Sequence, residues 1–118
     1  MKNIAPDIFR QRFLIEGFYE ISVDKSVIRK YFSEICTQLK LRMYGKPIIF
    51  SPGGEGKKEN QGYDAFVPLI DSGISVYVWT NKKFVSIILY TCKGFASEEA
   101  KEFTKKFFEI GELVSEEF

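Results

Sequence analysis

Two residues able to act as a nucleophile or an acid, Ser72 and Cys92, stand in two apolar runs, 71–79 and 84–92. Both runs alternate with the period of two that is typical of a half-buried strand, and the polar residues 80–83 join them as a turn. Antiparallel pairing places the start of the first strand beside the end of the second. We therefore expect a β-hairpin that brings the serine hydroxyl and the cysteine thiol to one edge of a sheet.

Proton transfer at this edge has few residue types to draw on, because the chain contains no histidine. Carboxylates, thiols, phenols, lysines and water remain. With only two cysteines as well, neither a zinc site nor a disulfide framework is expected, and we predict no metal. Cys36 falls in an apolar helical stripe and is interpreted as a small buried hydrophobic residue. The chain has neither a GxGxxG motif nor a P-loop, which removes the usual sequence grounds for a nucleotide cofactor.

The composition predicts a single soluble domain without a nucleic-acid or membrane partner. The 118 residues are 45% hydrophobic and 28% charged, and 17 basic against 16 acidic side chains leave a formal net charge of +1. This charge is too small for a general nucleic-acid binder. The chain has no 18-residue apolar run and no apolar signal core, so the expected location is the cytoplasm.

Three more strands are predicted around the hairpin. Residues 13–21 are apolar and aromatic, which suits a strand in the middle of a sheet. Residues 43–50 predict a strand in which Pro47 indicates an edge position or an irregular start. The glycine-rich residues 51–62 indicate an exposed loop, and residues 63–70 predict the strand that runs into the hairpin.

Two amphipathic helices complete the pattern. Asp24 is expected to cap the first helix, which runs through Lys40 with one apolar stripe. Ser97 is expected to cap the second, with two acidic residues in its first turn. The apolar side of this second helix is predicted at Ala100, Phe103, Phe107, Ile110 and Val114. Residues 115–118 are expected to fray.

The order β-α-β-β-β-β-α indicates an α+β fold in one domain, residues 1–118, with an antiparallel sheet and both helices on one face. The other face must be polar, or be buried against something else. Tyr77 and Trp79 alternate against Val76 and Val78, so both faces of the hairpin are partly apolar. This pattern predicts a homodimer formed through the sheet.

The hairpin resembles the signature of a known enzyme family. Residues 71–79, Asp-Ser-Gly-Ile-Ser-Val-Tyr-Val-Trp, are similar to Glu-Ser-His-Ile-Ser-Ile-His-Thr-Trp of the short prokaryotic S-adenosylmethionine decarboxylases. Residues 89–92, Leu-Tyr-Thr-Cys, are similar to the Val-Phe-Thr-Cys of that family, and the spacing of Ser72 and Cys92 is the same. A weaker resemblance extends over the whole chain, in length and in element order.

The resemblance implies a pyruvoyl-dependent lyase that decarboxylates S-adenosylmethionine for polyamine (spermidine) biosynthesis. In this family the serine hydroxyl attacks the carbonyl of the preceding residue, and autocatalytic cleavage turns the serine into a pyruvoyl cofactor. That cofactor binds the amine of the substrate and accepts the electron pair released with carbon dioxide. By position, the bond between Asp71 and Ser72 would be cleaved, Ser72 would be the pyruvoyl precursor and Cys92 the proton donor.

Several polar positions of the family pattern differ in this chain. The histidine after the serine is replaced by Gly73, and the histidine that assists self-cleavage is replaced by Tyr77. A phenol, with an ordinary pKa of about 10, is a poor base at neutral pH. Tyr77 is therefore interpreted either as the replacement proton carrier or as an aromatic side chain that fills the sheet face. Ile88 replaces an acidic residue, and Lys93 replaces a glycine.

Three hypotheses of function remain open at this point. The first is a self-cleaving decarboxylase acting on S-adenosylmethionine, or on another amino acid. The second is an uncleaved, catalytically inactive paralogue that binds the same ligand or regulates an active partner. The third is an unrelated small α+β interaction domain, in which substitution of Ser72 or Cys92 has only small effects on stability.

Overall fold

The computed structural model describes residues 1–51 and 61–118. Most of the glycine-rich stretch predicted as a loop, residues 52–60, lies outside the described residues. The elements are β1 (Gln11–Phe18), α1 (Lys25–Leu39), β2 (Ile48–Phe50), β3 (Gly62–Leu69), β4 (Ser72–Trp79), β5 (Phe84–Thr91), α2 (Ser97–Phe108) and β6 (Leu113–Glu117). In the described part of the chain, no helix has the length and apolar character needed to cross a membrane.

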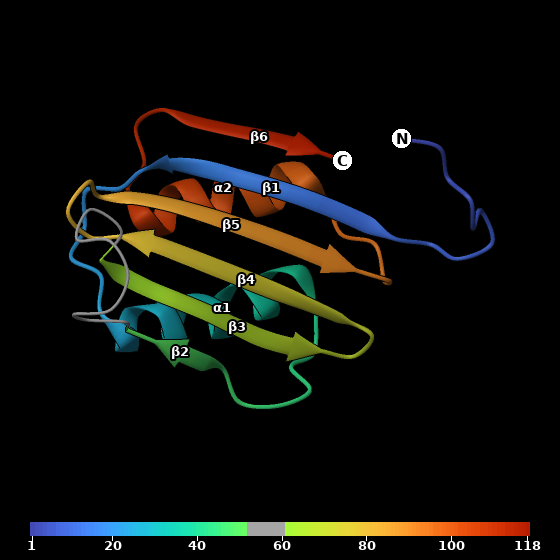
Figure 1. Cartoon of the computed structure of the whole chain (residues 1–118), viewed down its shortest axis with the longest axis horizontal. Helices are drawn as coiled ribbons and strands as arrows, with labels where there is room; N and C mark the ends of the chain where they lie inside the picture. Colours follow the sequence, from blue (N-terminus) through green and yellow to red (C-terminus); the bar gives the residue numbers. More distant parts are fainter. Residues whose placement is uncertain (52–60) are drawn as a thin grey trace.

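The described strands form one antiparallel sheet with the order β2-β3-β4-β5-β1-β6. Both helices pack on one face of this sheet, and the other face is left uncovered (Figure 1). The α+β fold and the placement of both helices on one face are therefore confirmed. The predicted element order is confirmed up to α2 but lacks the sixth strand.

The core lies between the sheet and the two helices, because alternate residues of each long strand point towards the helices. Its fully buried side chains include Ile15, Val67, Ile74, Val76, Ile87 and Leu89 from the sheet and Ile28, Tyr31, Phe32, Ile35 and Phe108 from the helices. The buried hydroxyls of Tyr31 and Thr104 are 2.8 Å apart and join α1 to α2. Burial raises the pKa of Tyr31, so its phenol stays protonated.

Helix α1 begins and ends where the sequence predicts. The side chain of Asp24 accepts a hydrogen bond from the amide of Val27 at 2.9 Å, and Lys40 ends the helix in the left-handed conformation. The predicted cap of α2 is wrong, because Ala96 is the N-cap and no side chain caps this helix. The hydroxyl of Ser97 instead donates to the carboxylate of Glu117, on the last strand.

The predictions for the C-terminal segment are wrong. Helix α2 ends at Phe108 rather than continuing to Val114, and residues 113–117 pair with β1 instead of fraying. The chain turns at Glu109, which adopts φ 52°, and then crosses close to β1. A Cβ atom on Gly17 would lie 2.5 Å from Cγ2 of Ile110, so the glycine makes room for this crossing.

Two strands are shorter or shifted relative to the predictions. The strand predicted at 43–50 is regular only at Ile48–Phe50, with a single bridge from Met43 to Leu69. The first strand spans Gln11–Phe18 rather than 13–21. Beyond the end of β1, the amide of Tyr19 still donates to the carbonyl of Lys83 at 2.8 Å, in line with the pairing of β1 and β5.

Candidate functional site

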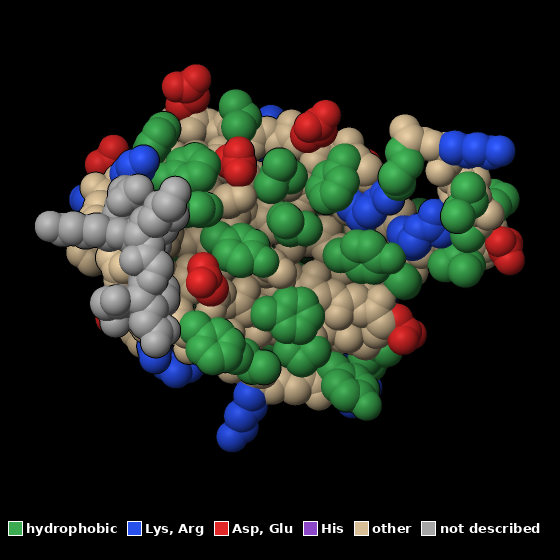
Figure 2. All heavy atoms as spheres, in the orientation of Figure 1, with side chains coloured by type: hydrophobic (Ala, Val, Ile, Leu, Met, Phe, Trp, Pro, Cys, Tyr) green, Lys and Arg blue, Asp and Glu red, His purple; other side chains and the backbone are tan. Residues whose placement is uncertain are grey.

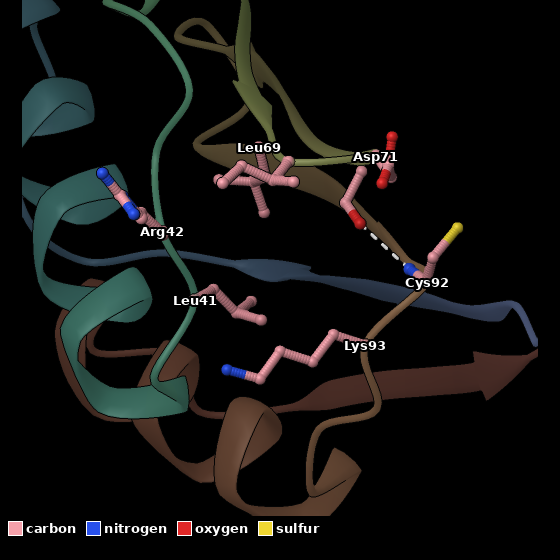
Figure 3. A pocket seen from close by; sticks show the side chains of 8 residues that line it. Leu41, Arg42, Leu69, Asp71, Cys92 and Lys93 are labelled. Atoms are coloured by element: carbon pink, nitrogen blue, oxygen red, sulfur yellow. Dashed lines mark hydrogen bonds between the residues drawn. The ribbon is translucent and has the colours of Figure 1, made fainter.

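The β4–β5 hairpin brings Ser72 and Cys92 side by side. Ser72 is the first residue of β4, and Cys92 follows the last residue of β5. The backbone amide of Cys92 donates a hydrogen bond to Oγ of Ser72 at 2.9 Å, the dashed line in Figure 3. A serine oxygen is thus held at the sheet edge by the backbone of the residue that carries the thiol. The thiol itself belongs to an exposed residue.

Asp71 gives the peptide bond before Ser72 an unusual backbone setting. It is the second residue of a two-residue turn between β3 and β4, and its φ is 55°. This left-handed conformation is costly for most residues with a side chain, although aspartate tolerates it better than most. The Asp71 carboxylate is exposed beside the serine.

A hollow of about 310 Å³ opens on the side of the sheet that α1 covers. It is lined by Leu41, Arg42, Leu69, Ile70, Asp71, Ser72, Cys92 and Lys93. The ammonium of Lys93 donates to the carbonyl of Lys40 at 3.0 Å, at the C-terminal end of α1, where a positive charge is favoured. Lys93 lies across the pocket in Figure 3, and the sulfur of Cys92 points away from Leu41 and Arg42.

A second hollow, of about 340 Å³, opens on the uncovered face of the sheet. It is lined by Phe66, Asp71, Ser72, Gly73, Ser75, Ile88 and Tyr90. Asp71 and Ser72 line both hollows, so the predicted cleavage bond lies between them. Asp71 supplies the one charged side chain among the described residues that line the second hollow. We refer to this second cavity as the open-face hollow.

The structure does not bring Tyr77 to this site. Tyr77 lies five residues along β4 from Ser72, which at roughly 3.3 Å per residue places their backbones about 17 Å apart. It belongs to the uncovered face, where it pairs with Ser86 on one side and Asp64 on the other.

Sequence reasoning also missed Phe66 and Arg42, which approach Ser72 only through the fold. The pairing of β3 with β4 is the one signal that could have found Phe66.

Thr91 is a further residue of this edge that the sequence analysis did not single out. It occupies the ladder position after the pair of Gly73 and Tyr90, and therefore lies across from Ser72. Its hydroxyl is fully buried and has no hydrogen-bond partner among the described residues. The described residues also contain no group of three or more side chains that could hold a metal ion.

Comparison with known proteins identifies a family and a similar fold. A family model described as S-adenosylmethionine decarboxylase matches residues 15–118. A solved structure, the crystal structure of the adenosylmethionine decarboxylase from Aquifex aeolicus, has a similar fold with a TM-score of 0.69. The two chains are 16% identical over 92% of this chain and 88% of that chain. A search of curated proteins found no significant match. Because the family model covers nearly the whole chain, the protein belongs to the S-adenosylmethionine decarboxylase family.

Proposed function

We propose that this protein is a self-processing, pyruvoyl-dependent decarboxylase of S-adenosylmethionine that works in polyamine biosynthesis in the cytoplasm. The observation that carries the proposal is the hydrogen bond from the amide of Cys92 to Oγ of Ser72, which fixes the hydroxyl at the hairpin edge. Family membership supports it. The left-handed backbone of Asp71 supports it as well, because strain in the ground state lowers the cost of rearranging the next peptide bond.

In the proposed processing reaction, Oγ of Ser72 attacks the carbonyl carbon of Asp71. The peptide C–N bond breaks as an ester C–O bond forms, and the proton of the hydroxyl moves to the freed amino group. Elimination across Cα and Cβ of residue 72 then releases residues 1–71 with a free carboxylate on Asp71. Hydrolysis of the remaining dehydroalanine releases ammonia and leaves a pyruvoyl group at the start of residues 72–118.

The residues around Ser72 fit such a group. When present, a pyruvoyl group supplies a carbonyl that binds an amine and accepts an electron pair. The buried hydroxyl of Thr91 lies across from position 72 and has no hydrogen-bond partner in the part of the chain that the structure describes, so it can donate to an additional oxygen there. The thiol of Cys92 is exposed at the same edge as Ser72 and is a group able to donate a proton. We propose Cys92 as the proton donor.

We propose that the open-face hollow binds the part of the substrate that lies beyond its amine. Its volume of about 340 Å³ is at the lower end of the range for small-molecule sites, roughly 300–1,000 Å³. Its walls include the rings of Phe66 and Tyr90, and the charged side chain among its described lining residues, that of Asp71, is acidic. These groups suit a ligand portion that is flat, apolar or positively charged rather than anionic.

We also propose that two copies pair through the uncovered face of the sheet. Large apolar side chains of this face are exposed, namely Phe18, Ile48, Phe50, Phe66, Tyr77, Tyr90 and Val114, and green side chains spread across it in Figure 2. Four strands of eight residues, with the shorter β2 and β6 at the edges, make up the footprint of this face, at roughly 3.3 Å per residue and about 4.8 Å per strand. Its area of about 600 Å² approaches the roughly 800 Å² per partner of stable complexes. Tyr77 lies on this shared face.

The proposed function is tested by the intact mass of the purified protein under denaturing conditions. We expect two fragments, residues 1–71 and residues 72–118, the second lighter by one ammonia than the same fragment beginning with serine. Ser72→Ala should remain full-length, because it lacks the attacking oxygen, and serves as the matched control. A wild-type chain that stays intact after prolonged incubation contradicts self-processing.

One observation favours a second candidate, an uncleaved paralogue that binds the ligand or regulates a partner. The chain has no histidine, so no imidazole assists proton transfer at Ser72. Titration of the intact chain with S-adenosylmethionine in a calorimeter tests the ligand-binding form of this candidate. Saturable binding without cleavage supports that form, and an uncleaved chain that does not bind the ligand leaves only the regulatory role.

A further inference from the structure

The ring of Phe66 occupies the space that a side chain at position 73 would fill. A Cβ atom built on Gly73 would lie 2.5 Å from Cε1 and 2.6 Å from Cζ of Phe66. Such separations are far below van der Waals contact, so any residue other than glycine at position 73 must displace the ring. Gly73 is the residue directly after Ser72.

The register of the sheet explains how the ring comes to lie there. Phe66 on β3 pairs with Ser75 on β4, while Gly73 pairs with Pro68. Phe66 therefore reaches diagonally along the uncovered face, two positions towards the hairpin end, a distance that an aromatic side chain spans. A glycine in a strand offers no side chain to pack, and an aromatic ring from the neighbouring strand can cover it.

The start of β4 is held from both neighbouring strands, because Phe66 comes from β3 and Cys92 follows β5. The amide of Cys92 holds Oγ of Ser72, while the ring of Phe66 packs on the backbone of the next residue. Glycine is the residue with the most backbone freedom, so without the ring the start of β4 would be less constrained. The ring of Phe66 packs on Gly73, and because 42% of the residue remains exposed, it also forms a wall of the open-face hollow.

We infer that Phe66 is a positioning residue that acts through Gly73 to hold Ser72 at the hairpin edge, and that positions 66 and 73 work only as a pair. The inference deepens the proposed function, on which the processing readout rests. The contact between Phe66 and Gly73 is present in the folded chain before any cleavage, so hydrogen exchange and thermal unfolding test it without the processing reaction.

The first test follows the amide of Cys92 by hydrogen exchange, detected by NMR, in the uncleaved full-length form of the wild-type chain and of Phe66→Ala. Loss of the ring should loosen the hydrogen bond to Ser72 and speed exchange of this amide by about tenfold or more. Phe50→Ala is the matched control, because Phe50 is another exposed aromatic residue of the same face, on the edge strand β2. Equal exchange rates in the two variants overturn the inference.

The second test is a cycle of Gly73→Ala, Phe66→Ala and the double variant, read by thermal unfolding. Phe66→Ala should lower the unfolding temperature by several degrees, because the ring no longer packs on the backbone at Gly73. Gly73→Ala displaces the partly exposed end of the same ring and so breaks the same contact, and the double variant should therefore be no less stable than Phe66→Ala alone. Strictly additive shifts overturn the inference. Phe66→Leu replaces Phe66→Ala in the cycle if the latter fails to fold.

The third readout is the rate at which the intact chain converts to fragments. Phe66→Ala should slow conversion by about tenfold relative to Phe50→Ala, as expected for a misplaced nucleophile. Equal conversion rates in the two variants contradict the positioning role. If the wild-type chain does not convert, the proposed function fails, and the exchange and unfolding results still decide whether Phe66 positions Ser72 through Gly73.

Discussion

At the scale of single residues, the two cysteines have opposite environments. Cys36 is 3% exposed on the apolar side of α1, as the sequence predicts, and burial raises the pKa of its thiol from 9.0 to about 11. Cys92 is exposed at the hairpin edge beside Ser72. The sulfur of Cys36 is therefore shielded from reagents, whereas the sulfur of Cys92 is accessible to them.

This contrast predicts selective labelling. At pH 8, iodoacetamide should modify Cys92 first in the folded protein, and Cys36 should react at least about 100-fold more slowly than it does in the unfolded chain, because burial raises its pKa from 9.0 to about 11. The raised pKa of Cys36 also makes the free energy of unfolding depend on pH. The stabilising contribution of the buried, protonated thiol is complete below pH 9 and declines as the pH rises through about 11. Peptide mapping by mass spectrometry locates the label. Cys92→Ser should abolish labelling of the native chain, and rapid labelling of Cys36 in that variant would contradict the burial.

At the scale of elements, the C-terminal strand depends on a close crossing over β1. The backbone after α2 passes Gly17 so closely that an added Cβ would lie 2.5 Å from Ile110 and 3.0 Å from the carbonyl oxygen of Glu112. The glycine therefore makes possible both the burial of Ile110 and the pairing of β6 with β1.

Gly17→Ala should destabilise the fold by about 1–3 kcal/mol, because the methyl group overpacks this crossing. Gly111→Ala is the matched control in the same segment, since nothing lies within 4 Å of its added Cβ. The control should change the free energy of unfolding by less than about 0.5 kcal/mol. Urea denaturation followed by tryptophan fluorescence measures both. Equal effects of the two substitutions would show that the crossing is not tight in solution.

At the scale of the whole molecule, the uncovered sheet face carries the proposed homodimer. Apolar side chains lie on it from β2 to β6, and a carboxylate within it, Glu16, accepts a hydrogen bond from Ser86 at 2.8 Å. That carboxylate keeps its partner when the face is covered, which lowers the cost of burying it.

Light scattering coupled to size-exclusion chromatography should therefore give twice the chain mass of 13.7 kDa. Phe50→Asp, which places a charge on the apolar face, should weaken association by at least about tenfold and shift the protein to the monomer. Ile4→Asp is the matched control, because Ile4 is 85% exposed in the segment before β1, outside the sheet. A monomeric wild-type protein, or equal effects of the two substitutions, would rule out pairing through this face.

The sequence by itself determined the features that depend on neighbours in the chain. Period-two alternation located β4 and β5, and the pattern of Asp24 with its apolar stripe located α1, because local hydrogen bonding and alternation decide such elements. Antiparallel pairing of a hairpin was sufficient to place Ser72 beside Cys92. The family resemblance rested on the same local stretch.

The tertiary structure alone decided the features that depend on contacts between distant segments. The helical spacing after Ser97 predicted a helix through Val114, but the packing of Ile110 on Gly17 and the free edge of β1 made residues 113–117 a strand. Phe66 reaches Gly73 only through the pairing of β3 with β4. Tyr77 shares a strand with Ser72, yet strand geometry separates the two, because five extended residues span about 17 Å and end on the opposite face.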